Sequence, residues 1–98
     1  VLHADQPPAQ GAVLVQPFLE ELVFRGFLQP LFVQNLGDRG GVVLTSLVFA
    51  VLHGDSALLP IFCLSLLLGS LQLCTRRLAA CAAVHALHNA VVFAMLGG

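Results

Sequence analysis

Charge is scarce in this chain of 98 residues, of which 58% are hydrophobic and only 9% are charged. A soluble domain carries roughly 25% charged residues, so the polar surface here is too small to cover a water-soluble globule. The formal net charge is −1 and no basic stripe is present, which argues against nucleic acid as a partner. The composition instead predicts a chain that resides in a lipid bilayer.

Several signatures of well-known enzyme classes are also missing. The sequence contains no HExxH pattern of zincin proteases, no GxSxG pattern of serine hydrolases and no glycine-rich phosphate loop. Its three cysteines, Cys63, Cys74 and Cys81, are odd in number and show no CxxC spacing. A disulfide framework or a zinc ribbon is therefore not expected, and we interpret the cysteines as buried structural thiols.

Long apolar runs predict helices, because β-strands are typically about 3–10 residues long. The expected helices cover approximately residues 17–36, 41–53, 57–74 and 78–96. The last two are close to the ~20 residues that cross a bilayer core. Pro17 suits a helix start, whereas Pro30 should kink or end the first helix. The predicted fold class is an all-α polytopic membrane helix bundle, with about four helices in this fragment and the first kinked near Pro30.

The first residues differ in composition from the rest of the chain. We interpret residues 1–16 as a linker or interfacial segment and residues 17–98 as the core. The opening stretch lacks the basic region and the continuous apolar region of a signal peptide. Because the chain starts at Val1 rather than Met, we expect it to be a fragment or an excised domain.

Three polar clusters interrupt the apolar segments. They are Glu20-Glu21-Leu22-Val23-Phe24-Arg25, Phe49-Ala50-Val51-Leu52-His53 and His85-Ala86-Leu87-His88-Asn89. In each cluster the polar groups recur about one helical turn apart, so they share one stripe of their helix. Ionisable side chains inside a membrane are costly and usually functional. A rise of about 1.5 Å per residue places all three clusters at depths within the bilayer. We therefore expect them to meet at one shared polar site.

The first two clusters suggest a way to activate water. Glu21 and Arg25 stand four residues apart with the acid first, the favourable order for an intrahelical ion pair. One interpretation is that this pair simply neutralises two charges and so lets the helix enter lipid. Glu20 has no such local partner, and a carboxylate removed from water can act as a general base. His53 follows Phe49 by one turn and can reach the depth of Glu20. A glutamate and a histidine around one water would form a nucleophile in a dry site.

The third cluster offers hydrogen-bond donors. Asn89 is costly in hydrocarbon unless it is hydrogen-bonded, and its amide could stabilise a developing oxyanion. His85, one turn earlier, could do the same or help to bind a metal. For His88 we favour a hydrogen bond between helices.

In this order and at these separations, the clusters resemble the motifs of the CAAX prenyl endopeptidases and bacteriocin-processing enzymes, a family also called CPBP or Abi. The motifs of that family are EExxxR, FxxxH and Hxxx(N/B). The matching residues are Glu20, Glu21, Arg25, Phe49, His53, His85 and Asn89, and the resemblance covers approximately residues 17–95. Family members usually have further membrane helices before the first motif.

The resemblance implies an intramembrane endopeptidase that acts on a peptide or a membrane protein. Its expected location is the bacterial cytoplasmic membrane. Glu20 together with His53 would activate water. His85 and Asn89 would support the oxyanion. The residues that support the site would be Glu21, Arg25 and Phe49.

Metal dependence and function both have alternatives at this point. Glu20, His53 and His85 are residue types that also bind zinc, although a mechanism without metal or other cofactor is favoured. The main alternative function is a non-proteolytic membrane scaffold or immunity factor on the same fold. A further alternative is a metal or proton carrier built on the glutamate and histidine cluster.

Overall fold

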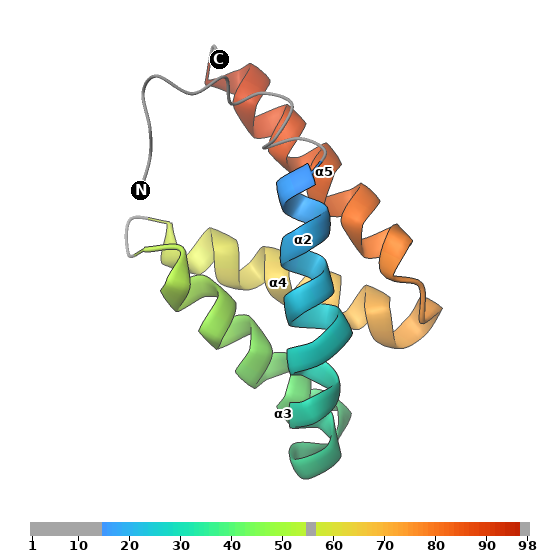
Figure 1. The fold of residues 1–98 in the computed structure, drawn as a ribbon. Helices are drawn as coiled ribbons and strands as arrows, with labels where there is room; N and C mark the ends of the chain where they lie inside the picture. Colours follow the sequence, from blue (N-terminus) through green and yellow to red (C-terminus); the bar gives the residue numbers. More distant parts are fainter. Residues whose placement is uncertain (1–14, 55–56, 97–98) are drawn as a thin grey trace.

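The computed structural model describes residues 15–54 and 57–96, which are almost entirely helical and contain no strand. The elements in chain order are α2 (Gln16–Val23), the π-helix η2 (Phe24–Leu28), α3 (Gln29–Leu52), α4 (Leu58–Thr75) and α5 (Leu78–Met95) (Figure 1). The predicted all-α fold is confirmed. The expected linker falls almost wholly outside the described residues.

The chain remains helical through Pro30, where the sequence predicted a kink. Pro17 lies in the first turn of α2 and Pro30 in the first turn of α3. The irregularity lies just before Pro30, in η2, where the N–H of Gln29 donates to the carbonyl of Phe24. A proline has no N–H and its ring crowds the preceding turn, and one widened turn gives that ring room without ending the helix.

The break in the first long helix lies at Gly37. This residue has φ 81° and ψ 175°, the non-helical conformation inside α3, and positive φ is readily adopted only by glycine. The chain reverses direction here, as the lower end of Figure 1 shows. A Cβ placed on Gly41 would lie 2.7 Å from the backbone nitrogen of Val33, so the two arms of α3 pack backbone against backbone.

Among the residues that the structure describes, three helical stretches are long and apolar enough to cross a membrane. They are Gln16–Leu52, which contains the reversal at Gly37, Leu58–Thr75 and Leu78–Met95. Large apolar side chains are exposed on their outer faces; examples are Phe27, Leu59, Leu67, Leu87 and Met95. These faces are suited to contact with lipid.

The interior of the bundle is as polar as it is apolar. Its buried apolar residues are Phe24, Val42, Phe49, Ala50, Leu64, Leu68 and Cys81. Its buried polar residues are Glu21, Arg25, Gln29, Thr45, Ser46, Ser65 and His85. Such a distribution, with apolar residues outside and polar residues inside, is typical of a membrane protein that encloses a functional site.

One prediction about the cysteines was wrong for two of the three. Cys81 is buried, but Cys63 and Cys74 are exposed on α4. Because α4 is apolar on all sides, its sequence does not indicate which face turns inward.

Candidate active site

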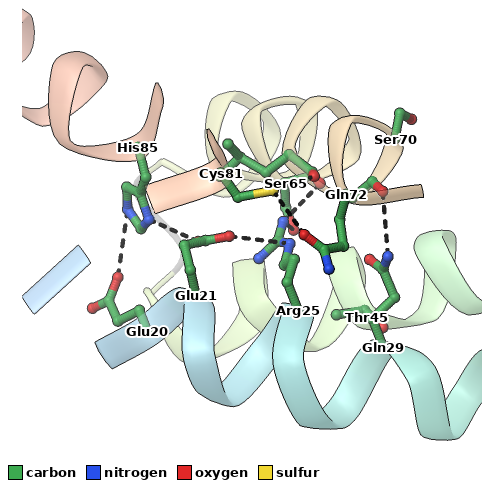
Figure 2. Close-up of polar contacts among 12 residues, drawn as sticks. Glu20, Glu21, Arg25, Gln29, Thr45, Ser65, Ser70, Gln72, Cys81 and His85 are labelled. Atoms are coloured by element: carbon green, nitrogen blue, oxygen red, sulfur yellow. Dashed lines mark hydrogen bonds and ion pairs between the residues drawn. The ribbon is translucent and has the colours of Figure 1, made fainter. Parts of the chain in front are cut away.

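The structure brings the three polar clusters together. Glu20 and Glu21 come from α2, Arg25 from η2, His53 from the end of α3 and His85 from α5. Figure 2 shows Glu20, Glu21 and His85 facing one another across the gap between α2 and α5. The reversal at Gly37 is what returns the end of α3 to the level of α2.

One oxygen of Glu20 faces two imidazoles. Its Oε1 lies 3.7 Å from Nε2 of His53 and 3.5 Å from Nε2 of His85. Its Oε2 accepts a hydrogen bond of 3.3 Å from Nε2 of Gln16. Both imidazole distances exceed the ordinary hydrogen-bond length of about 2.7–3.2 Å. Glu20 is therefore oriented by Gln16 while its other oxygen remains available.

The hydrogen bonds of the two histidines fix which ring nitrogen faces Glu20. Nδ1 of His53 lies 2.6 Å from the carbonyl oxygen of Phe49, which can only accept, so Nδ1 carries the hydrogen. Nδ1 of His85 lies 2.8 Å from Oε2 of Glu21 and donates to that carboxylate. In both rings Nε2 is therefore the atom left for chemistry, and both Nε2 atoms point at Glu20.

Glu21 is fully buried and joins the first cluster to the third. Its Oε2 accepts from His85, and its Oε1 lies 3.4 Å from Nε of Arg25, the ion pair that the spacing predicted. Arg25, also fully buried, donates through Nη2 to the carbonyl oxygen of Ser65 at 2.7 Å and to the Ser65 hydroxyl. A buried ion pair offsets its desolvation only when it has such additional partners.

Phe49 is the apolar centre of the site. Its ring centroid lies 4.8 Å from that of Phe24, 4.2 Å from that of His53 and 5.9 Å from that of His85. The guanidinium carbon of Arg25 lies 5.0 Å from the same centroid. Because it contacts both imidazoles and accepts a hydrogen bond through its carbonyl, Phe49 restricts the orientation of both rings.

The remaining residues of the third cluster lie further along α5. Asn89 is half-buried and follows His85 by one turn. Nδ1 of His88 is buried, and among the described residues it has no hydrogen-bond partner. The hydrogen bond between helices that was expected for His88 is therefore not formed through that atom.

Sequence reasoning missed two partners of the site. A serine in an apolar helix usually bonds back to the preceding turn, but Ser65 is fully buried and accepts a hydrogen bond from Arg25. Ser70 follows the usual pattern and donates to the carbonyl of Leu66, at 2.8 Å. Gln16 stands four residues before Glu20, a spacing that could have indicated the contact.

The residues of the site do not form a metal-ligand set. Within residues 15–54 and 57–96 no group of three or more His, Cys, Asp or Glu side chains could hold a metal ion. The zinc alternative, with Glu20, His53 and His85 as ligands, gains no support from this geometry, so we derive no step through a metal.

An open apolar groove lies directly beside Glu20. Its volume is about 420 Å³. It is lined by Val15, Gln16, Leu19, Glu20, Val23 and Phe24. Because its other walls are almost entirely apolar, a hydrophobic segment that lies in it would be placed next to the carboxylate.

Comparison with known families gives a match over most of the chain. A family model described as type II CAAX prenyl endopeptidase Rce1-like matches residues 8–91. This match confirms the resemblance drawn from the three motifs. Searches of curated proteins and of solved structures gave no match.

Proposed function

Because the chain belongs to the type II CAAX prenyl endopeptidase Rce1-like family, we propose that it forms the core of an intramembrane endopeptidase whose nucleophile is a water activated by Glu20 and His53. The observation that supports this most directly is the convergence of two imidazole Nε2 atoms on one oxygen of Glu20. Glu20 Oε1 faces two imidazoles at distances longer than a hydrogen bond, and it lies beside an apolar groove. This arrangement suits general-base catalysis.

The proposed reaction follows from the atoms that remain available. A water between Glu20 and His53 gives up a proton to Glu20 as its oxygen attacks the carbonyl carbon of the substrate. The proton then passes from Glu20 to the nitrogen of the leaving amine, and the peptide bond breaks. Glu20 ends as it began, and one water is consumed.

The developing oxyanion needs donors on the other side of the carbonyl. Asn89 would donate through its amide, and His85 through Nε2. With Nδ1–H of His85 directed at Glu21, donation from Nε2 requires the imidazolium form of that ring. Glu21 and Arg25 do not touch the substrate in this scheme. They position His85.

The groove indicates the class of substrate. Its apolar walls favour a hydrophobic peptide or the edge of a membrane-spanning segment, with the scissile bond at Glu20. Three spanning-length helices and the family make the chain part of an integral membrane protein. The bacterial cytoplasmic membrane is its proposed location.

The deciding experiment compares cleavage of a hydrophobic peptide pool by the wild-type protein and by Glu20→Gln, in liposomes. We expect Glu20→Gln to lower kcat by about 10²–10⁴-fold, the usual contribution of a general base, while the helix content and membrane insertion stay unchanged. A variant that cleaves as fast as the wild type would exclude Glu20 as the base. Full biological activity of a Glu20→Gln, His53→Ala double variant would favour the non-proteolytic scaffold instead.

A chelator added to the same assay tests the cofactor. We expect turnover to persist, because the described residues form no ligand set. If the chelator abolishes turnover and added zinc restores it, Glu20, His53 and His85 would be metal ligands instead.

A further inference from the structure

The groove beside Glu20 has a second polar side chain in its wall, that of Gln16. The described residues that complete the lining are all apolar: Val15, Leu19, Val23 and Phe24. Gln16 and Glu20 stand four residues apart, so they lie on the same face of α2. Gln16 is exposed. In a pocket with mostly apolar walls, the few polar groups are what fix the orientation of a ligand.

The amide of Gln16 has hydrogen-bonding capacity left after it binds Glu20. Nε2 carries two hydrogens, and one of them is donated to Oε2 of Glu20 at 3.3 Å. Within residues 15–54 and 57–96 this is the hydrogen bond that the Gln16 side chain makes, so its second N–H and its carbonyl oxygen Oε1 remain for a ligand. One donor and one acceptor on a planar amide complement a peptide group, which also carries one of each.

A peptide that enters the groove brings backbone groups that need partners. Away from water an unpaired backbone N–H or C=O is costly, and an unpaired N–H is the rarer of the two in proteins. The apolar side chains of the groove cannot accept a hydrogen bond, and in the proposed reaction Glu20 binds the water. Gln16 is therefore the side chain of this wall that can accept an N–H from the substrate.

We propose that Gln16 binds the substrate, and that its Oε1 accepts the backbone N–H of a peptide group next to the scissile bond. This rests on the proposed function, which places the scissile bond at Glu20. Nε2 of Gln16 lies 3.3 Å from Oε2 of Glu20. The rise per residue of an extended chain is about 3.3 Å as well. An extended peptide with its scissile bond at Glu20 thus brings a neighbouring peptide group to Gln16.

The contact would select substrates by their backbone rather than by their side chains. A peptide that is extended at the scissile bond presents a free N–H to Gln16, whereas a helical peptide has its N–H groups bonded within the helix. A peptide with proline at the position that faces Gln16 has no N–H to donate. We therefore expect the enzyme to take hydrophobic segments that are unwound beside the cleavage site and to refuse proline at one flanking position.

A binding cycle between protein and peptide tests the contact without any turnover. Wild type and Gln16→Met, in liposomes, would each be titrated with three fluorescent hydrophobic peptides whose scissile bond is replaced by an uncleavable ketomethylene group. One peptide is the parent, and the other two are N-methylated at the peptide group on either side of the scissile bond. In the wild type we expect N-methylation at one of these positions to raise Kd about fivefold to tenfold, the effect of one lost hydrogen bond.

Gln16→Met should bind the parent peptide more weakly by the same factor, and N-methylation should then change its Kd by less than about twofold. Equal effects of N-methylation in the two proteins, or no effect in the wild type, would overturn the proposal. The matched control is Gln34→Met, an exposed glutamine of α3 outside the groove, which should bind all three peptides as the wild type does. Gln16→Leu repeats the test if Gln16→Met does not fold.

Turnover of cleavable peptides separates substrate binding from the orientation of Glu20, which Gln16 also provides. If Gln16 acted only on Glu20, Gln16→Met would lower kcat by the same factor for every peptide and leave each Kd unchanged. That result would overturn the proposal and leave the proposed function intact. Conversely, a wild type that shows the expected binding cycle but cleaves no peptide would support the contact and overturn the proposed hydrolysis.

Discussion

The two glutamates of the first cluster are neighbours in sequence, but the regions around them are held very differently. Glu20 is 24% exposed, and its contacts with the two imidazoles are 3.5 Å and 3.7 Å long. Glu21 is fully buried and accepts a hydrogen bond of 2.8 Å from His85 while it pairs with Arg25. The reactive carboxylate of Glu20 is therefore loosely held, whereas the neighbouring carboxylate of Glu21, which positions His85, is fixed by a hydrogen bond and an ion pair.

Replacement of Glu21 should have the largest effect on stability. In Glu21→Leu the buried guanidinium of Arg25 loses its counter-charge, so we expect the free energy of unfolding to fall by about 3–5 kcal/mol. Unfolding monitored by circular dichroism in detergent would measure the loss. The matched control is Glu20→Leu, which removes a partly exposed carboxylate and should change stability by less than about 1 kcal/mol. Equal losses in the two variants would contradict the distinction between the regions.

A smaller effect is expected at Ser65, which extends the rigid region onto α4. Ser65→Ala leaves one donor bond of Arg25 unmade, and we expect a loss of about 1–3 kcal/mol in the free energy of unfolding. Ser70→Ala is the control, because Ser70 is exposed and donates to the carbonyl of Leu66 in its own helix. Its effect should stay within about 0.5 kcal/mol. If both variants unfold alike, α4 does not take part in holding Arg25.

An effect on stability similar to that of Ser65→Ala is expected at Phe49, which lies between the two regions. Phe49→Leu removes the ring contacts with His53 and His85, each worth about 0.5–1.5 kcal/mol. We expect a stability loss of about 1–3 kcal/mol for the two contacts together, and a lower kcat, since both imidazoles gain freedom. Phe27→Leu, at an exposed phenylalanine, should change neither quantity. Full activity of Phe49→Leu would show that the carbonyl bond alone orients His53.

Much of the fold was predictable because membrane helices are apolar, long and separated by turn residues. The helices after residue 57 were expected at 57–74 and 78–96 and are found at Leu58–Thr75 and Leu78–Met95. The irregularity expected near Pro30 is the widened turn η2 just before the proline, and the break expected between the helices at 17–36 and 41–53 is found at Gly37. A single widened turn accommodates the proline ring, while Gly37, with its positive φ, reverses the chain. The sequence predicts that a proline disturbs helical hydrogen bonding. It does not show whether a neighbouring turn widens to accommodate the proline ring.

The centre of the site was predictable from spacing, but its surroundings were not. Polar residues one turn apart on otherwise apolar helices have to face inward, so Glu20, His53 and His85 could be expected to meet. The position of Ser65 depends on how α4 is rotated about its axis. Because α4 is apolar on every side, no periodic pattern records that rotation.

The reversal at Gly37 also sets a rule about length. Glu20 lies 17 residues before Gly37, and His53 lies 16 residues after it. The two arms of this helical hairpin are therefore matched to within one residue. A single inserted residue in either arm would turn its reactive side chain by about 100° and move it by about 1.5 Å along the axis. An insertion or deletion in either arm would therefore move the acid and the imidazole out of register with each other.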